Sequence, residues 1–224
     1  MLSGFDDEKV AGVCGQQIVP HHIDNNPVQW YRPVSAPSVT KFCFPNRSDF
    51  DGLSPEQKKR ICTWDNVNAM YRRDILIKIP FREVIFAEDI YWAKDALENG
   101  YALVYNNYAQ VEHYHHESAE SSFKRNLLEH YQVYMIFGIV PCITSDGLLE
   151  VLKNIKLLLK EDRVSFSSKL KWLKYNKSLR RAARLSDRLF VRTVEAGEQE
   201  LNKLFIELEN NNHQALKPRS SDNG

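Results

Sequence analysis

The hydrophobic pattern of this chain changes near residue 145, and the change limits the folds that the chain can adopt. Before that point, short apolar runs alternate with glycine, proline and asparagine, which is typical of strands and helices in an α/β unit. Beyond it, apolar residues recur at the spacing of one helix face, at Leu148, Leu149, Val151, Leu152, Ile155, Leu158, Leu159, Leu170, Leu173, Leu179, Ala183, Leu185 and Leu189. The pattern predicts an α/β domain over 1–145, an amphipathic helical appendage over 146–210 and a disordered tail over 211–224.

Local signals within the first part predict its individual elements. Val10–Gly15 is an apolar run closed by glycine, typical of a buried strand. Residues 18–60 are rich in proline and show little periodicity, so we expect a long excursion with one short helix, capped by Ser54. The remaining pattern predicts helices over 72–80, 87–98 and 118–137, and strand pieces over 101–105 and 109–114.

Charge is unevenly distributed, although the 30 basic and 29 acidic residues nearly cancel. The near balance argues against a dedicated nucleic-acid-binding protein. Residues 151–193 hold thirteen Lys or Arg against three Asp or Glu, whereas residues 1–150 hold fourteen against twenty. The sequence therefore predicts an acidic globular part that carries a basic helical part.

Two interpretations of the basic part stay open. Either its leucines pack on the domain and its basic face is solvated, or it docks on an anionic membrane surface with Trp172 and Phe190. The basic residues concerned are Lys169, Lys171, Lys174, Lys177, Arg180, Arg181, Arg184 and Arg188. RNA binding is less favoured, because aromatic residues are not interleaved with the charges as stacking platforms.

Other features favour a cytoplasmic location. The scattered cysteines Cys14, Cys43, Cys62 and Cys142 form no CxxC pair, so we expect reduced thiols. Residues 1–7 turn acidic where the apolar core of a signal peptide would begin. The longest apolar run, Val133–Ile143, is far shorter than the about 20 residues of a spanning helix. We expect a cytoplasmic chain, or one attached peripherally to the cytoplasmic face of the membrane.

Two kinds of side chain between Trp64 and His116 could carry chemistry. Glu88 and Asp89 begin a predicted helix, where acidic residues usually compensate the helix dipole. They project in different directions, so one can be held by backbone amides while the other faces a cleft as a general base. His113 and His115 would share one face of a strand and could bind Mn²⁺ or Zn²⁺, although lone histidines are more often structural.

The order of short motifs in this region resembles family 2 glycosyltransferases, especially rhamnosyltransferase-like enzymes of bacterial polysaccharide synthesis. The motifs are N-V-N-A-M-Y-R-R-D, then A-E-D-I-Y-W-A-K, G-Y, V-E-H-Y-H and F-K-R, with V-A-G-V-C-G-Q-Q near the start. The resemblance covers roughly residues 5–130. It implies a GT-A fold, of which this chain would hold the acceptor-side portion, over residues 1–145, and an inverting transfer from a nucleotide-sugar donor to a glycan or lipid-linked acceptor.

The same resemblance implies roles for individual residues. Asp89 would be the base that deprotonates the acceptor hydroxyl, with Glu88 as its supporting neighbour. Trp64, Asn66 and Asn68 would line the substrate pocket, and Lys124 and Arg125 would approach the donor diphosphate. His113, or else His115, would be a metal ligand.

Family members carry a nucleotide-binding half with an Asp-x-Asp metal motif before this region. Asp49-Phe50-Asp51 matches that motif on paper but lies in the proline-rich excursion, out of the family order. We therefore expect a truncated or split form that binds Mn²⁺ or Mg²⁺ only together with the missing half. Without that half, the Val10 strand is predicted to be an exposed edge.

Two other functions remain open from the sequence. The chain could be a non-catalytic remnant, or a partner that completes a separately encoded donor-binding half. It could instead be a basic protein that binds a membrane surface, whose binding would weaken with added salt and would not need Asp89.

Overall fold

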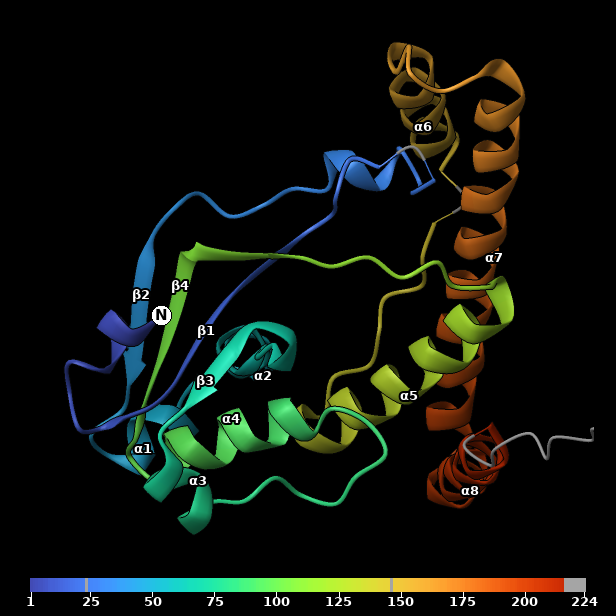
Figure 1. Cartoon of the computed structure of the whole chain (residues 1–224). Coiled ribbons are helices and arrows are strands. Elements are labelled where there is room, and N and C mark those ends of the chain that lie inside the picture. Colours follow the sequence, from blue (N-terminus) through green and yellow to red (C-terminus); the bar gives the residue numbers. More distant parts are fainter. Residues whose placement is uncertain (23, 146, 216–224) are drawn as a thin grey trace, which may run out of the picture.

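The computed structural model describes residues 1–22, 24–145 and 147–215, with side chains as far as residue 210. A small sheet with short helices occupies one side of the molecule, and long helices occupy the other (Figure 1). The strands are β1 (Val10–Ile18), β2 (Val39–Cys43), β3 (Ala69–Tyr71) and β4 (Ala102–Glu112). The helices are α1 (Arg47–Asp51), α2 (Pro55–Cys62), α3 (Arg73–Lys78), α4 (Glu88–Glu98), α5 (Ala119–Phe137), α6 (Leu148–Lys160), α7 (Phe166–Ala196) and α8 (Glu198–Ala215), with 3₁₀ turns η1 (Leu2–Phe5), η2 (Gln29–Tyr31) and η3 (Asn66–Asn68).

The four strands form one mixed sheet, so the predicted α/β class is confirmed. Their order is β2-β4-β1-β3; β1 and β4 run parallel, and the two outer strands are antiparallel to their neighbours. The prediction that the Val10 strand is an exposed edge is wrong. It lies between β4 and β3, and Val10 and Val13 are fully buried.

The strand pieces predicted over 101–105 and 109–114 are a single strand, β4. Its pairing with β1 shifts register, because Cys14 lies opposite Tyr105 whereas Gln16 lies opposite Gln110. Gly15 sits at this irregularity, where a Cβ atom would lie 2.0 Å from the carbonyl oxygen of Ala109. Only glycine fits so close an approach between two backbones.

The proline-rich excursion contains more regular structure than its composition predicts. The helix that Ser54 caps is present as α2, with a reciprocal capping box between Ser54 and Gln57. Strand β2 and helix α1 were not expected. β2 has a mostly exposed surface and only five residues, so it shows no alternating hydrophobic pattern in the sequence.

The helices predicted within 72–137 are confirmed as α3, α4 and α5. Gly100 follows α4 with a φ of 77°, the left-handed conformation that ends many helices. The buried face of α4 places Trp92 in the main core, where its ring contacts Trp64 and Tyr71.

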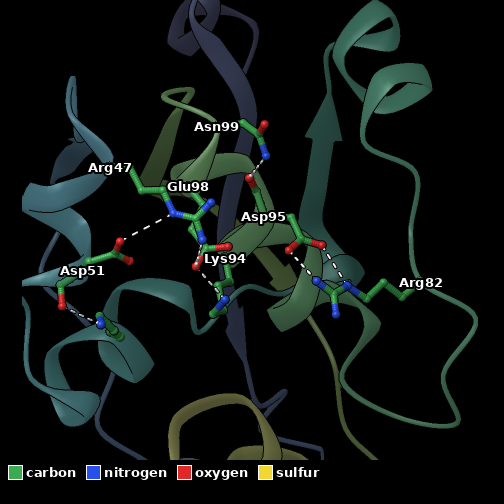
Figure 2. Close-up of polar contacts among 8 residues, drawn as sticks. Arg47, Asp51, Arg82, Lys94, Asp95, Glu98 and Asn99 are labelled. Atoms are coloured by element: carbon green, nitrogen blue, oxygen red, sulfur yellow. Dashed lines mark hydrogen bonds and ion pairs between the residues drawn. The ribbon is translucent and has the colours of Figure 1, made fainter.

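Ion pairs hold the outer face of α4 in its second half (Figure 2). Arg82 donates two hydrogen bonds to the Asp95 carboxylate, at 2.9 and 2.6 Å. Lys94 donates to Glu98 at 2.6 Å, and the Arg47 guanidinium of α1 lies 3.8 Å from the same carboxylate. These contacts connect the outer face of α4 with α1 and with the segment before the helix.

The predicted helical appendage packs against the α/β part. α7 packs against α5, and buried Phe190 packs with Leu127 and Leu128 of α5 and with Leu201 of α8. The proposal that Trp172 and Phe190 dock on a membrane is therefore wrong, because both are buried inside the protein, at 4% and 0% exposure.

Two further findings concern the helical part. Part of the predicted disordered tail is helical, since α8 extends to Ala215; the rest of that prediction lies outside the described residues. In the part of the chain that the structure describes, we find no helix with both the length and the apolar character needed to cross a membrane.

Candidate active site

A cleft of about 730 Å³ lies where the C-terminal ends of β1 and β4 approach the start of α4. Segments distant in the sequence form its walls, including the η3 turn, the residues after β4, and parts of α5 and α7. Seven of the residues singled out from the sequence line it: Trp64, Asn66, Glu88, Asp89, His113, His115 and Arg125. Two others, Asn68 and Lys124, are not among its described lining residues.

Asp89 is half-buried in the first turn of α4. Burial raises the pKa of its carboxyl group to about 6, and repulsion from Glu88 adds to that increase. The backbone N–H groups of Ile90 and Asn66 oppose it, and Ile90 donates to Asp89 Oδ1 at 2.8 Å. A carboxylate with this pKa is ionised at neutral pH yet is a stronger base than an exposed aspartate.

Glu88 is fixed by side chains from the η3 region, not by backbone amides. The Asn66 amide nitrogen donates to Glu88 Oε1 at 2.9 Å, and the Tyr71 hydroxyl donates to Asn66 Oδ1. The indole N–H of Trp64 in turn donates to the Tyr71 hydroxyl at 2.8 Å. A hydrogen-bonded chain therefore runs from the buried Trp64 to a carboxylate on the cleft wall.

The η3 turn is itself tied to the sheet. Gln17 at the end of β1 donates to Asp65 at 2.6 Å, and the other oxygen of Asp65 accepts from the Val67 backbone at 3.0 Å. Asn68 donates to the Ala109 carbonyl at 2.9 Å, at the place where Gly15 approaches β4. Asn68 thus contributes to the support of the turn beside the cleft.

The two predicted metal ligands lie close together but beyond the strand. β4 ends at Glu112, so His113 and His115 are not on one strand face as predicted. Their ring centroids are 4.3 Å apart, and both rings line the cleft. The His116 ring points elsewhere and stacks on Tyr175 at 4.7 Å.

We tested whether the cleft residues could hold a metal ion. Among the described residues, no group of three or more His, Cys, Asp or Glu side chains has the geometry to do so. His113 and His115 supply two imidazoles, fewer than the ligand sets that proteins commonly use. The described residues do not make a metal site by themselves.

The basic residues predicted to approach a diphosphate differ in position. Arg125 lines the cleft and pairs with Glu117 at 2.6 Å, whereas Lys124 pairs with Glu120 at 2.7 Å outside the cleft walls. Arg32 also lines the cleft, although the sequence did not indicate it as a site residue. It lies in the proline-rich excursion, and no local pattern connects it with the later motifs.

A pair of asparagines links α7 to the cleft. Asn26 is completely buried, and its amide nitrogen donates to Asn176 Oδ1 at 2.7 Å while Asn176 donates back at 3.0 Å. The Asn26 backbone N–H also donates to the Tyr114 hydroxyl at 3.0 Å. The two asparagines are 150 residues apart, so the sequence alone offers no signal for their contact.

Comparison with known proteins gives two relatives. The chain is 32% identical over 130 residues to the O-antigen chain rhamnosyltransferase WbaN of Salmonella anatum, covering 56% of this chain and 38% of that protein. It is 31% identical over 125 residues to the O-antigen chain rhamnosyltransferase RfbN of Salmonella typhimurium, covering 54% of this chain and 37% of that protein. The matched stretch thus spans well under half of each relative. No family model matches the chain, and the search of solved structures found no significant match.

Proposed function

We propose that this chain carries the acceptor-side part of an inverting glycosyltransferase of polysaccharide synthesis, with a partial GT-A-like fold. The observation that carries the proposal is Asp89, a half-buried carboxylate with a pKa of about 6 on the wall of a large cleft. The similarity to two proteins named as O-antigen rhamnosyltransferases supports the reaction class.

The proposed reaction uses Asp89 as the base. Its carboxylate accepts the proton of an acceptor hydroxyl while the hydroxyl oxygen attacks the anomeric carbon of the donor sugar. The bond from that carbon to the diphosphate oxygen breaks on the opposite face, so the configuration inverts and the nucleoside diphosphate leaves. Burial keeps the pKa of Asp89 raised, and repulsion from Glu88, which Asn66 holds, adds to that effect.

A positively charged side chain beside the leaving diphosphate would stabilise the negative charge that develops on it in the transition state. Arg125 is a candidate for this role, because it lines the same cleft as Asp89. Its ion pair with Glu117 holds the guanidinium in place at 2.6 Å and would be exchanged for the phosphate oxygens. The acceptor would be a glycan or lipid-linked glycan.

The donor-binding half and its metal motif are proposed to lie outside residues 1–224 or on a separately encoded chain. This part of the proposal rests on the coverage of the relatives, of which the chain matches 38% and 37%. Mn²⁺ or Mg²⁺ would then be bound mainly by the other half.

The test is a transfer assay of the chain, combined with a donor-binding half where one is needed. Nucleotide-linked rhamnose is the first donor to try, because both relatives are named as rhamnosyltransferases. We expect Asp89→Asn to lower turnover by roughly 10²–10⁴-fold. Asp74→Asn, which changes an exposed carboxylate of α3 outside the cleft, is the matched control and should remain near wild type. Wild-type turnover by Asp89→Asn would exclude Asp89 as the base.

A second candidate function is a non-catalytic partner that completes a donor-binding chain, favoured by the partial coverage of the relatives. In the transfer assay with a donor-binding half, wild-type turnover by Asp89→Asn would favour this candidate, whereas loss of turnover would favour the catalytic proposal. Calorimetric titration with UDP and dTDP, with and without Mn²⁺, tests a separate point, which is whether donor binding needs a second half. Metal-dependent binding by this chain alone would show a donor site within it. Absence of binding would favour a chain that needs a second half.

A further inference from the structure

Helix α6 exposes a row of leucines that the fold does not cover. Leu148, Leu152 and Leu159 share one helix face by their spacing, and they are 71%, 51% and 60% exposed. Leu149 lies beside the row and is 81% exposed. The inward face is separate, because Leu158 is buried with Trp30 and Trp172. An exposed apolar surface of this kind marks an interaction site.

Lysines run next to the leucine row. Lys153, Lys156 and Lys160 are three and four residues apart, so they form one exposed line along the helix. α6 contains a single acidic residue, Glu150, and residues 151–193 carry thirteen basic residues against three acidic ones. Lysine stems can lie along an apolar surface while the ammonium groups reach outward to anions.

The position of α6 leaves this face accessible. Figure 1 shows α6 at one end of the molecule, beside the first half of α7 and away from the sheet. Arg180 of α7 holds the beginning of α6 by donating to the Ser145 carbonyl at 3.1 Å and lying 3.8 Å from Glu150. The exposed face is therefore presented by a helix that is fixed to the rest of the fold.

We propose that the Leu148–Leu152–Leu159 face of α6 binds an anionic lipid surface. The leucines would enter the boundary between headgroups and acyl chains, and the lysines would contact lipid phosphates. Protein–protein interfaces are depleted in lysine and enriched in aromatic residues, so this composition fits a lipid surface better than a polypeptide. The proposal goes beyond the transfer reaction and does not depend on it.

The test is co-sedimentation of the purified chain with vesicles. Phosphatidylcholine mixed with phosphatidylglycerol should bind the chain, whereas phosphatidylcholine alone should bind it much more weakly. The variant Leu148→Gln/Leu152→Gln/Leu159→Gln should lose at least about tenfold in partitioning, because it removes the apolar contact. Lys153→Gln/Lys156→Gln/Lys160→Gln should lose the preference for anionic lipid. The control Ile77→Gln/Ile206→Gln changes exposed apolar residues on α3 and α8 and should bind as wild type.

Several results would overturn the proposal. These are failure of the wild-type chain to bind the anionic vesicles, or unchanged binding by the leucine variant. A dimer in gel filtration that the leucine variant dissociates, without vesicle binding, would assign the face to a second copy instead. If the triple variant fails to fold by circular dichroism, Leu152→Trp replaces it. Its added fluorescence should shift to the blue with anionic vesicles, and absence of that shift contradicts the proposal.

Discussion

The two ends of helix α4 carry acidic residues in opposite situations. Glu88 and Asp89 begin the helix on the wall of the cleft, and the Asp89 pKa is raised to about 6. Asp95 and Glu98, one to three turns later, are held in ion pairs with Arg82 and Lys94 (Figure 2). One helix therefore holds a carboxylate suited to accept a proton and others that join it to its neighbours.

Asp89 and Asp95 differ because of the groups that surround each side chain, and not because of their positions on the helix alone. A helix N-terminus favours negative charge by about 0.3–1 kcal/mol, which would lower the pKa of Asp89. Burial outweighs it: the increase from 3.8 to about 6 corresponds to roughly 2 kcal/mol after allowance for partial exposure. A residue type that usually stabilises a helix start is here a half-buried carboxylate with a raised pKa, which we propose as the base.

The largest expected effect is on the pH dependence of transfer. Only ionised Asp89 can accept a proton, so the rate should fall about tenfold per pH unit below pH 6 and level off above it. Initial rates at limiting acceptor, measured from about pH 4 to pH 8, check this. A rate that stays constant down to pH 4 would contradict the assignment of Asp89.

A smaller loss of turnover is expected when the side chain that holds Glu88 is removed. Asn66→Ala deletes the amide that links Glu88 to Tyr71, and we expect turnover to fall about tenfold through misplacement of the site. Asn99→Ala is the matched control, because that amide donates to the Asp95 carbonyl at the other end of α4 (Figure 2). Equal effects of the two variants would show that Asn66 acts only through stability.

The contrast between Asp89 and Asp95 predicts that neutralising each carboxylate changes the free energy of unfolding in opposite directions. Because folding raises the pKa of Asp89, ionisation destabilises the folded state as the pH rises from about 4 to above 6. Asp89→Asn should therefore raise the free energy of unfolding at pH 7 by about 1–2 kcal/mol and have little effect below pH 4. Asp95→Asn should lower the free energy of unfolding by about 0.5–1 kcal/mol, because it removes the ion pair with Arg82. Urea denaturation at both pH values measures these changes.

The smallest effect concerns the Arg82–Asp95 pair. Arg82→Lys keeps the charge but loses the two-point contact, so we expect the free energy of unfolding to fall by about 0.5 kcal/mol. High salt should shrink the difference between wild type and variant. A loss that does not depend on salt would mean that packing on Tyr91, whose ring lies 4.8 Å from the Arg82 guanidinium, dominates.

Local signals predicted much of the chain that surrounds the cleft. The helix capped by Ser54 and the helices over 87–98 and 118–137 were expected, because caps and helical periods depend on neighbouring residues. Glu88 and Asp89 could be singled out for the same reason, since they begin a helix within a recognisable series of motifs.

Contacts between distant segments could not be predicted. The central place of β1 depends on pairing with β3 and β4, and the cleft depends on Arg32 and Asn26 approaching residues far along the chain. One of the two open interpretations placed Trp172 on a membrane surface, because its neighbours are basic, yet α7 turns it inward against Trp30. A single sequence shows the helical periodicity, but it does not show which face of a helix the rest of the fold covers.

Titration of the Asp89 carboxyl carbon by NMR tests the raised pKa of this residue most directly, with Asp89→Asn used to assign the signal. It needs neither donor nor acceptor, so it examines the site without assuming the reaction. We predict a midpoint near pH 6, set by burial and by Glu88. A midpoint at or below the 3.8 of an ordinary aspartate would contradict the claim that this helix start holds a base.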